Sequence, residues 1–473
     1  MRTVRAAHHE RWSLVRVLVV NHSAAQHLGG SELSILSIVS AWRQHLPELD
    51  PHLVSPAPDS ALEQAAIAAG WTPHVVAYGD WVSFAERESR ARRRLERAAA
   101  RTQVDALAEL IDRVKPALVI VNTVVTPWAA VAAYERGVPV AWFVREFVDD
   151  RPGFRLREGR EETLRHLHAL ANRVLANSQS VRASIADVVP ADQVHVAHPV
   201  VDGDAISAAT AHREHLRFHE GTLRIGLVGR VTPEKGHRVA VEALGELRRR
   251  GVDAELDMVG GVILPGFDHA LRHLARRIGV DDRVHLLGEK RQPLQHLAAT
   301  DVSLVPSARE AFGRVTLESL ALGLPVVASA EGGATELVEH GVSGFLVDMG
   351  DPIAIADALE RYVDEPRLLE KHGAAARRRA DTVITGPHGI ASTIAALEAT
   401  ALSGPDRAPS YRRPYPLADA ESLRPGMRIA LEFADRASTT VRRLARLLRH
   451  PVPPLRRRWW TLSERSRQRA RRG

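Results

Sequence analysis

The sequence predicts an α/β fold in which two doubly wound, parallel-sheet units follow one another along the chain. Short runs rich in Val, Ile and Leu alternate with helical segments over most of the 473 residues. The alternation restarts after residues 199–222, where Pro199, Gly203 and Asp204 interrupt the pattern. A chain of this length is expected to form more than one domain, and two sheets fit better than one sheet of about a dozen strands.

In the first half, apolar runs have the length and composition of buried strands, and helices separate them. The longest predicted helices cover residues 31–45 and 84–114. The predicted strands are Val15–Val20, His52–Val54, His74–Val76, Leu118–Val121, Val138–Phe143, Val174–Ala176 and His195–Ala197. Because these runs are nearly continuous in apolar residues, we expect a parallel sheet that is covered by helices on both faces.

The second half repeats this alternation and ends with a predicted helix at Ile390–Leu402. Its predicted strands are Leu223–Val228, Glu255–Val259, Arg283–Leu287, Val302–Val305, Pro325–Ala328 and Gly344–Val347. We therefore divide the chain into domains at 1–200 and 201–403, followed by a tail at 404–473. Ligands of such sheets bind at the carboxyl ends of the strands, so the expected site lies in a cleft that the two domains face.

The tail, residues 404–473, differs from the rest of the chain in charge. It holds 18 Arg, no Lys and 6 acidic residues, whereas the chain as a whole has a net charge of only +7. Its amphipathic stretch Arg424–Arg449 and its pair Trp459-Trp460 suit an anionic membrane surface. Nucleic acid is the rival partner, because a basic tract alone does not discriminate between the two, and we rank the membrane first. A solvated tail with no specific ligand is the third interpretation.

Composition excludes several classes of site. The chain has no cysteine, so disulfides, thiolate metal sites and cysteine nucleophiles are excluded together. No run of about 18 apolar residues is present, and Met1–Arg11 lacks the apolar core of a signal peptide. We expect a cytoplasmic protein, with the basic tail as an attachment to the inner face of the membrane.

The segment after the strand at 223–228 combines glycines with cations. Gly229, Arg230, Lys235 and Gly236 lie between this strand and the next helix. Glycines let the backbone approach a ligand, a helix N-terminus favours an anion, and the two cations would neutralise a diphosphate. A tight turn with solvated cations is the alternative. The spacing is not Gly-x-Gly-x-x-Gly, which disfavours a dinucleotide cofactor.

Two carboxylates, Glu310 and Glu318, lie in a loop and in an apolar helix respectively. Glu318 has leucines and a valine as neighbours, and an ionised carboxylate there is costly unless donors satisfy it. Sugar hydroxyls are suitable donors. Backbone N–H groups near Gly313 and Gly333 could meet hydroxyl or phosphate oxygens. Taken alone, Glu310 could equally be a solvated loop acid.

Together these segments resemble the retaining GT4-type glycosyltransferases of the GT-B fold. The resemblance rests on Glu-x7-Glu, on the following Ala-Leu-Gly-Leu-Pro-Val-Val-Ala-Ser, and on Gly-Gly-Ala-Thr-Glu-Leu-Val; it spans residues 15–400 and is strongest over 223–350. It implies two Rossmann-like domains that face a cleft. It also implies an enzyme that moves a sugar from a nucleotide-diphospho-sugar to a glycan, lipid or small-molecule acceptor. Retention of configuration, with neither metal nor cofactor, is part of the same expectation.

The resemblance also assigns roles to residues on the donor side. Arg230 and Lys235 would contact the diphosphate, and Glu310 would contact the transferred sugar, which makes these three the expected catalytic residues. Glu318 would hold the ribose hydroxyls. The other expected donor contacts are Gly229, Gly288, Phe312, Gly313, Gly333 and Thr335.

On the acceptor side, Gly29 and Gly30 follow the first strand in a setting that resembles the family's first-domain glycine pair. The alternative is a plain turn with Ser31 as the helix cap. Many relatives carry a histidine after the fifth strand, where this chain has Arg145 and Glu146. These two are candidates for polar acceptor contacts, or for a surface ion pair.

The histidines that could replace the missing one are His22, His27 and His198, which lie at strand ends. Each could instead be a structural or solvent-facing histidine.

The sequence has no His/Asp cluster with metal-ligand spacing, so no metal is expected. Asp202 and Asp204 have the spacing of a metal-binding Asp-x-Asp, but they lie in the predicted interdomain turn and we interpret them as turn residues. Two other functions fit the same fold. One is a sugar-nucleotide epimerase, and the other is a non-catalytic scaffold that binds a sugar nucleotide or a glycan.

Overall fold

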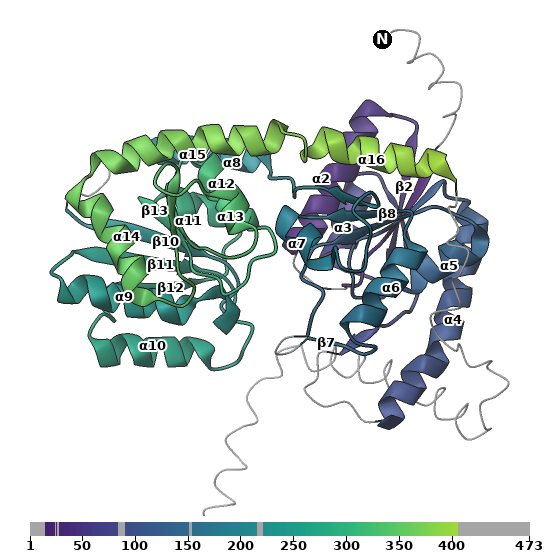
Figure 1. The fold of residues 1–473 in the computed structure, drawn as a ribbon, viewed down its shortest axis with the longest axis horizontal. Helices are drawn as coiled ribbons and strands as arrows, with labels where there is room; N and C mark the ends of the chain where they lie inside the picture. The colour runs from purple at the N-terminus through teal and green to yellow at the C-terminus, as the bar shows by residue number, and fades with distance from the viewer. Residues whose placement is uncertain are drawn as a thin grey trace, which may run out of the picture. The chain divides into compact units, whose positions relative to one another are not determined.

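The computed structural model describes residues 15–404, except residues 24, 26–27, 84–89, 151–153 and 215–220 (Figure 1). Two parallel sheets and their helices make up most of this part of the chain. The basic tail predicted at 404–473 lies outside the described residues, apart from Gly404. Within the described residues, none of the helices is both long enough and apolar enough to cross a membrane.

The first sheet has seven strands in the order β3-β2-β1-β5-β6-β8-β9, and each pairs with its neighbours in parallel. The strands are β1 (Val15–Val20), β2 (Leu49–Ser55), β3 (Thr72–Val75), β5 (Leu118–Val121), β6 (Val140–Val144), β8 (Arg173–Ala176) and β9 (Val194–Val196). The accompanying helices are α2 (Gly30–His45), α3 (Ala61–Ala68), α4 (Arg90–Val114), α5 (Trp128–Arg136), α6 (Arg160–Leu170) and α7 (Gln179–Ile185). Two strands were not predicted from the sequence: β4 (Val82–Ser83) and β7 (Arg155–Leu156), which pair as a short antiparallel ribbon.

The second sheet has six parallel strands in the order β12-β11-β10-β13-β14-β15. This is the 3-2-1-4-5-6 order of a Rossmann domain. The strands are β10 (Leu223–Val228), β11 (Ala254–Val259), β12 (Val284–Gly288), β13 (Val302–Val305), β14 (Val326–Ser329) and β15 (Gly344–Val347). The helical segments that follow β9 along the chain are α8 (Gly203–Glu214), η1 (Pro233–Lys235), α9 (His237–Arg249), α10 (Phe267–Ile278), α11 (Pro293–Ala298), α12 (Arg314–Ala321), α13 (Ala334–Leu337), α14 (Pro352–Asp364), α15 (Arg367–Thr385) and α16 (Ile390–Ser403).

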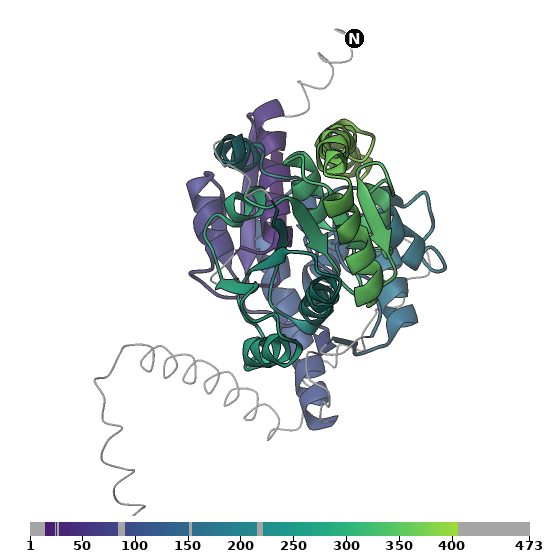
Figure 2. The ribbon, with the colours of Figure 1, turned by 90° about the vertical axis from the view of Figure 1, so that its left-hand side faces the viewer.

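Helices cover both faces of the second sheet (Figure 2). Side chains of β10, β11 and β13 pack on one face with α9, α10 and α14. On the other face, Val305, Val326 and Ala328 pack with α12, α13 and α15. Because alternate residues of a strand point to opposite faces, apolar residues at nearly every position bury both faces. The predicted doubly wound fold is therefore confirmed for both sheets.

The segment 199–222, predicted as a break between domains, contains the helix α8. The carboxylate of Asp202 accepts the backbone N–H groups of Asp204 and Ala205, at 3.0 Å each, and so caps the start of this helix. Asp202 therefore caps the N-terminus of α8, a role similar to that of the predicted turn residue. Ala209 of α8 packs with residues of α11, which places the helix with the second sheet.

The last helix, α16, packs in the core of the first sheet, although the sequence-based division assigned residues 201–403 to the second domain. Ile394 and Leu397 are buried with residues of β1, α2 and β6. Glu398 of α16 accepts a hydrogen bond from Nε1 of Trp42, at 2.9 Å. The chain therefore leaves the first sheet after β9, builds the second sheet and returns.

Replacing Leu397 with alanine tests this return. The side chain is fully buried, so Leu397→Ala should lower the free energy of unfolding by about 2–5 kcal/mol. Leu402→Ala is the matched control, because Leu402 lies in the same helix and is 42% exposed. Urea unfolding of both variants, followed by circular dichroism, measures the difference. Equal and small losses would mean that α16 is not part of a core.

Candidate functional site

The candidate site lies where the strand order of the second sheet reverses, between β10 and β13. Loops leave the carboxyl ends of these two strands in opposite directions, which opens a crevice there. A cavity of ≈ 520 Å³ occupies this place. Its charged lining residues are Asp202, Arg230, Lys235, Arg291, Glu310, Arg314 and Glu318, and Gly30 and Leu33 of α2 also line it.

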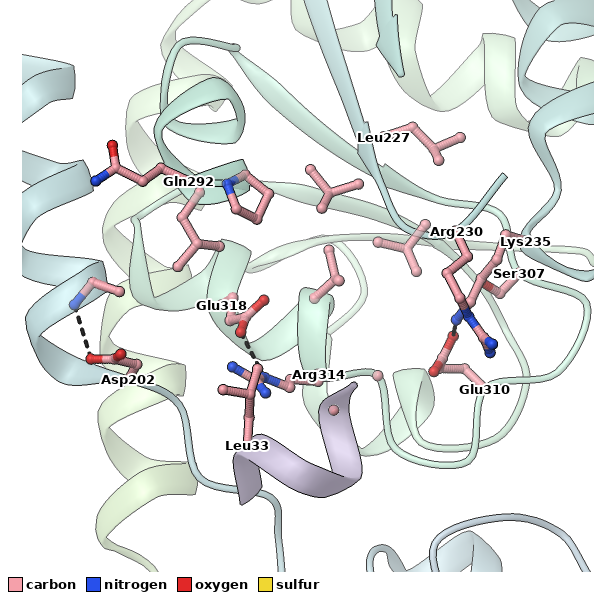
Figure 3. Close-up of a pocket in the computed structure, with 18 of the residues that line it drawn as sticks. Leu33, Asp202, Leu227, Arg230, Lys235, Gln292, Ser307, Glu310, Arg314 and Glu318 are labelled. Carbon is pink, nitrogen blue, oxygen red and sulfur yellow. Dashed lines mark hydrogen bonds and ion pairs between the residues drawn. The ribbon is translucent and has the colours of Figure 1, made fainter. Parts of the chain in front are cut away.

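Lys235 and Glu310 form an ion pair in which Nζ lies 2.6 Å from Oε2. Lys235 ends the short helix η1 after β10, and Glu310 lies in the loop after β13. Arg230 is exposed on the same side of the cavity, and within the described residues it makes no ion pair (Figure 3). Two cations thus stand beside one carboxylate, so this end of the cavity suits an anionic ligand.

Glu318 lies further along the cavity, on α12 (Figure 3). Only 8% of its side chain is exposed, and Nε of Arg314 donates to its Oε1 at 2.7 Å. Burial raises the pKa of the Glu318 carboxyl; Arg314 opposes this shift and the charge of Asp202 adds to it. The need of Glu318 for donors was predicted from the sequence, but Arg314 was not, although an i, i+4 Arg-Glu spacing on a helix was the available signal.

A glycine turn holds the loop that carries Glu310. The N–H of Gly333 donates to the carbonyl of Glu310 at 2.8 Å. A Cβ on Gly332, whose φ is +58°, would lie 2.1 Å from the same carbonyl oxygen. A Cβ on Gly333 would lie 2.2 Å from the carbonyl oxygen of Phe312. Only glycines allow this approach, so the turn fixes the backbone on which Glu310 sits.

The expected donor-side residues divide into two groups. Gly313, at the N-cap of α12, and Glu318 line the cavity with the three expected catalytic residues. The others are not among its lining residues: Gly229, Gly288, Phe312, Gly333 and Thr335. Phe312 is 2% exposed and packs in the core beside α12. Thr335 donates from Oγ1 to the carbonyl of Gly332, at 2.7 Å, within its own turn.

Polar residues gather where strands of the first sheet end. Arg145, after β6, donates to Oδ1 of Asn122 from Nε and Nη2, at 3.1 and 2.9 Å, and to Ser34 from Nη1, at 3.1 Å. Burial lowers the pKa of Arg145 to about 10. Glu146 accepts a hydrogen bond from Thr123, at 3.4 Å. The described residues contain no ion pair between Arg145 and Glu146, so the surface-pair interpretation is wrong.

Gly29 is the N-cap of α2, and Gly30 is its first residue. Ser31 does not cap this helix; its hydroxyl donates to the carboxylate of Glu32 at 2.7 Å. The alternative of a serine cap is therefore wrong, and Gly30 lines the cavity as a residue without a side chain. A Cβ on Gly30 would lie 3.7 Å from Cδ of Arg314, an ordinary van der Waals distance, so Arg314 lies against the start of α2.

His22 and His198, at strand ends of the first sheet, are not among the residues that line the cavity. His22 is half-buried, and its Nδ1 has no hydrogen-bond partner within the described residues. His27 lies outside the described residues. His198 packs against Phe312 with ring centroids 5.0 Å apart, and burial lowers its pKa to about 4. The ring of His198 is therefore packed and mostly neutral at pH 7, and neither of its nitrogens has a hydrogen-bond partner within the described residues.

Glu336, from the Gly-Gly-Ala-Thr-Glu-Leu-Val motif, connects α13 with the first helix after β8. Its carboxylate accepts the backbone N–H groups of Gln179 and Ser180, at 2.8 and 2.6 Å, and the hydroxyl of Ser180, at 2.7 Å. These are the orphan donors at the start of α7. This contact was not predicted from the sequence, because the two segments are 156 residues apart.

Two family models match the chain. "Glycosyltransferase Family 4" matches residues 28–205, and "Glycosyl transferases group 1" matches residues 209–379. The chain belongs to the GT4-type glycosyltransferase family. The first of these ranges contains the strands of the first sheet except β1, and the second contains all six strands of the second sheet.

Curated relatives carry the name D-inositol 3-phosphate glycosyltransferase. The relative from Salinispora arenicola is 36% identical over 251 residues, which are 49% of this chain and 55% of that protein. The relative from Streptomyces griseus is 36% identical over 189 residues, 38% of this chain and 40% of that protein. The chain spans about half the length of the curated relatives that it matches.

Solved structures share the fold at low sequence identity. Alr3699/HepE of Anabaena, in complex with UDP and glucose, is 22% identical, with a TM-score of 0.64 over 82% of this chain and 100% of that one. A glycosyltransferase from Rickettsia africae is 17% identical, with a TM-score of 0.66 over 83% of this chain and 100% of that one. The GT-B fold expected from the sequence is confirmed.

Adding one methyl group at Gly332 should displace the Glu310 loop. Gly332→Ala places a Cβ against the Glu310 carbonyl and should lower the free energy of unfolding by about 1–3 kcal/mol beyond its control. The control is Gly341→Ala, because Gly341 also has a positive φ, +74°, but its Cβ would meet nothing within 4 Å. Thermal unfolding compares the two. Equal losses of unfolding free energy in the two variants would show that glycine is needed at these positions because of the positive φ, rather than because of the contact with Glu310.

Proposed function

We propose that this chain transfers a sugar from a nucleoside-diphospho-sugar to a hydroxyl group of a glycan, a lipid-linked saccharide or a small polyol. The observation that carries the proposal is the arrangement of charges along one cavity. Arg230 and Lys235 stand with Glu310 at one end, and the buried Glu318 stands further along it (Figure 3). A diphosphate fits the cations, the transferred sugar fits Glu310, and the ribose fits Glu318.

In this proposal the chemistry is electrostatic and uses no metal. The bond between C1 of the sugar and the diphosphate oxygen breaks, and negative charge grows on the leaving diphosphate. Arg230 and Lys235 stabilise that charge. The acceptor oxygen bonds to C1 on the face that the diphosphate leaves, so the configuration is retained. The acceptor's proton passes to a leaving phosphate oxygen, which needs no side chain as a general base.

The comparisons support a particular donor as the first to test. The Anabaena protein was crystallised with UDP, with UDP and glucose, and with UDP-glucose. The curated relatives are named for transfer to an inositol phosphate. We therefore propose a uridine nucleotide sugar as donor and a polyol or glycan hydroxyl as acceptor. The polar strand ends at Asn122, Arg145 and Glu146 are the proposed acceptor side.

The decisive test measures nucleotide release. The protein should release nucleotide from one of UDP-, GDP- or ADP-sugars when an acceptor is present, and EDTA should not reduce the rate. Lys235→Met and Glu318→Gln should each lower kcat/KM about 100-fold or more, because each removes a charge-assisted contact to the donor. Arg238→Met is the matched control, since this arginine is exposed and pairs with Glu242 outside the cavity.

Other outcomes identify the alternatives. Variants as active as the wild type would contradict the assignment of the site. A donor recovered with an inverted sugar centre and no transfer would identify an epimerase. Tight donor binding without turnover on any acceptor would identify a scaffold.

We also propose that the tail, residues 404–473, holds the protein at the inner face of an anionic membrane, on the ground of its arginines and its Trp459-Trp460 pair. The full chain should sediment with vesicles of phosphatidylglycerol and phosphatidylcholine at low salt, and a 1–403 truncation should not. Salt should weaken the binding, because screening shortens the reach of the arginines. Equal sedimentation of both proteins would remove the membrane from this proposal.

A further inference from the structure

The loop between β11 and α10 exposes three consecutive large apolar side chains. Val262, Ile263 and Leu264 are 43%, 58% and 50% exposed. Elsewhere in the described part of the chain, exposed large apolar residues occur singly, as at Ile67 and Ile353. A single exposed apolar residue is ordinary, whereas a run of three is unfavourable in water unless a partner covers it. Residues 262–264, the apolar run, are therefore a candidate interaction surface.

The backbone of this loop is held at both ends, so the exposure does not come from a slack segment. At one end, an N–H of the loop after β10 donates to the carbonyl of Gly261 at 2.8 Å. At the other end, the N–H of Phe267 donates to the carbonyl of Leu264 at 3.1 Å and closes a turn over Pro265 and Gly266. Gly266 has φ +85° and ψ −5°, the values that the third residue of a type II turn takes. These contacts fix the apolar run in its exposed position.

The helix that follows the loop, α10, presents a basic face to solvent. On its inner side, Leu271 is buried in the core of the second sheet. On its outer side, Arg272, Arg276 and Arg277 are exposed. Asp268 is the single acidic residue of this helix. In Figure 1, α10 lies at the outer edge of the helices that cover the second sheet. The apolar run is thus continuous along the chain with a cationic surface.

An anionic bilayer is the partner that suits both parts of this surface. Apolar side chains enter the boundary between headgroups and acyl chains, and arginines pair with the headgroup phosphates. The apolar run and α10 line none of the described cavities, so a small molecule held in a pocket is not the partner that they suit. The arginines and the Trp459-Trp460 pair of the tail match the same partner.

We propose that the apolar run and the arginine face of α10 form a docking surface for an anionic membrane. The surface is small and does not hold the protein by itself; the tail brings it to the bilayer and raises its effective concentration there. Because β10 and β11 are parallel neighbours, the loop leaves the same edge of the sheet as the candidate site, and docking holds that edge at the membrane. Docking is independent of the reaction at the site.

A single fluorescent label tests whether the apolar run enters the bilayer. The chain has no cysteine, so Ile263→Cys in the full chain carries one nitrobenzoxadiazole group, whose emission reports polarity. Vesicles of phosphatidylglycerol and phosphatidylcholine at low salt should shift this emission to shorter wavelength and strengthen it several-fold. Ile67→Cys, at an exposed position of α3, is the matched control and should show no shift. Phosphatidylcholine alone should give a much weaker response, because the arginines lack an anionic partner.

Substitutions measure what each part of the surface contributes. Ile263→Asp should lower the vesicle partition coefficient of the full chain about tenfold, because it removes apolar contact and adds a charge that anionic headgroups repel. Ile67→Asp should leave it unchanged. Arg272→Gln combined with Arg276→Gln should weaken binding at low salt and reduce its salt dependence. Arg378→Gln, at an exposed position of α15, should have little effect. All these side chains are exposed, so thermal unfolding should not change.

Three results would overturn the docking surface. The full chain binding no anionic vesicles is the first. The second is a full chain that binds while the label at position 263 keeps its emission and Ile263→Asp binds as the wild type does; binding then belongs to the tail. The third is a label whose emission shifts without vesicles as the protein concentration rises, together with a dimer in analytical ultracentrifugation. A second copy of the chain, rather than a membrane, would then cover the apolar run.

Discussion

The geometry of the site depends on close backbone contacts that only glycine residues allow. A Cβ on Gly236, whose φ is +74°, would lie 2.1 Å from the carbonyl oxygen of Pro306, and Gly332 has the same relation to Glu310. Pro306 begins the loop after β13 and Glu310 lies within it, so glycines from two other segments contact this loop at two points. Lys235 directly precedes Gly236. The contact therefore places its ammonium within 2.6 Å of the Glu310 carboxylate.

These backbone contacts explain how a cavity lined by both acidic and basic residues keeps its geometry. The ion pair of Lys235 and Glu310 is partly exposed, so solvent screening reduces its own contribution to stability. Backbone packing rather than the pair fixes the loop, which leaves the cation available to a ligand. The pair of Arg314 and Glu318 differs, because its carboxylate is almost fully buried. Removing one partner there leaves an uncompensated charge, and this is costly in a dry environment.

The sequence predicted the sheets well because nearly continuous apolar strands leave little ambiguity. β1, β5, β10, β13 and β15 have the predicted bounds, and the Glu-x7-Glu motif located the cavity. Contacts between distant segments escaped prediction for a physical reason. The apolar residues of α16 indicate that the helix is buried, but they do not indicate which sheet it packs against. A two-residue strand such as β4 is too short to show a periodic pattern. The burial of Arg145 likewise depends on Asn122 and Ser34, which only the fold brings together.

The return of α16 to the first sheet has a consequence for biosynthesis. Residues 203–385 form the second sheet and its helices, yet Leu397 completes the core beside β1 and α2. A ribosome releases the chain from its N-terminus, and domains generally fold as units in that order. Here the first sheet keeps an apolar surface on α2 uncovered until α16 has emerged, after the strands of the second sheet. The second sheet is translated later, but all of its strands lie between residues 223 and 347. It can therefore fold without waiting for a distant segment.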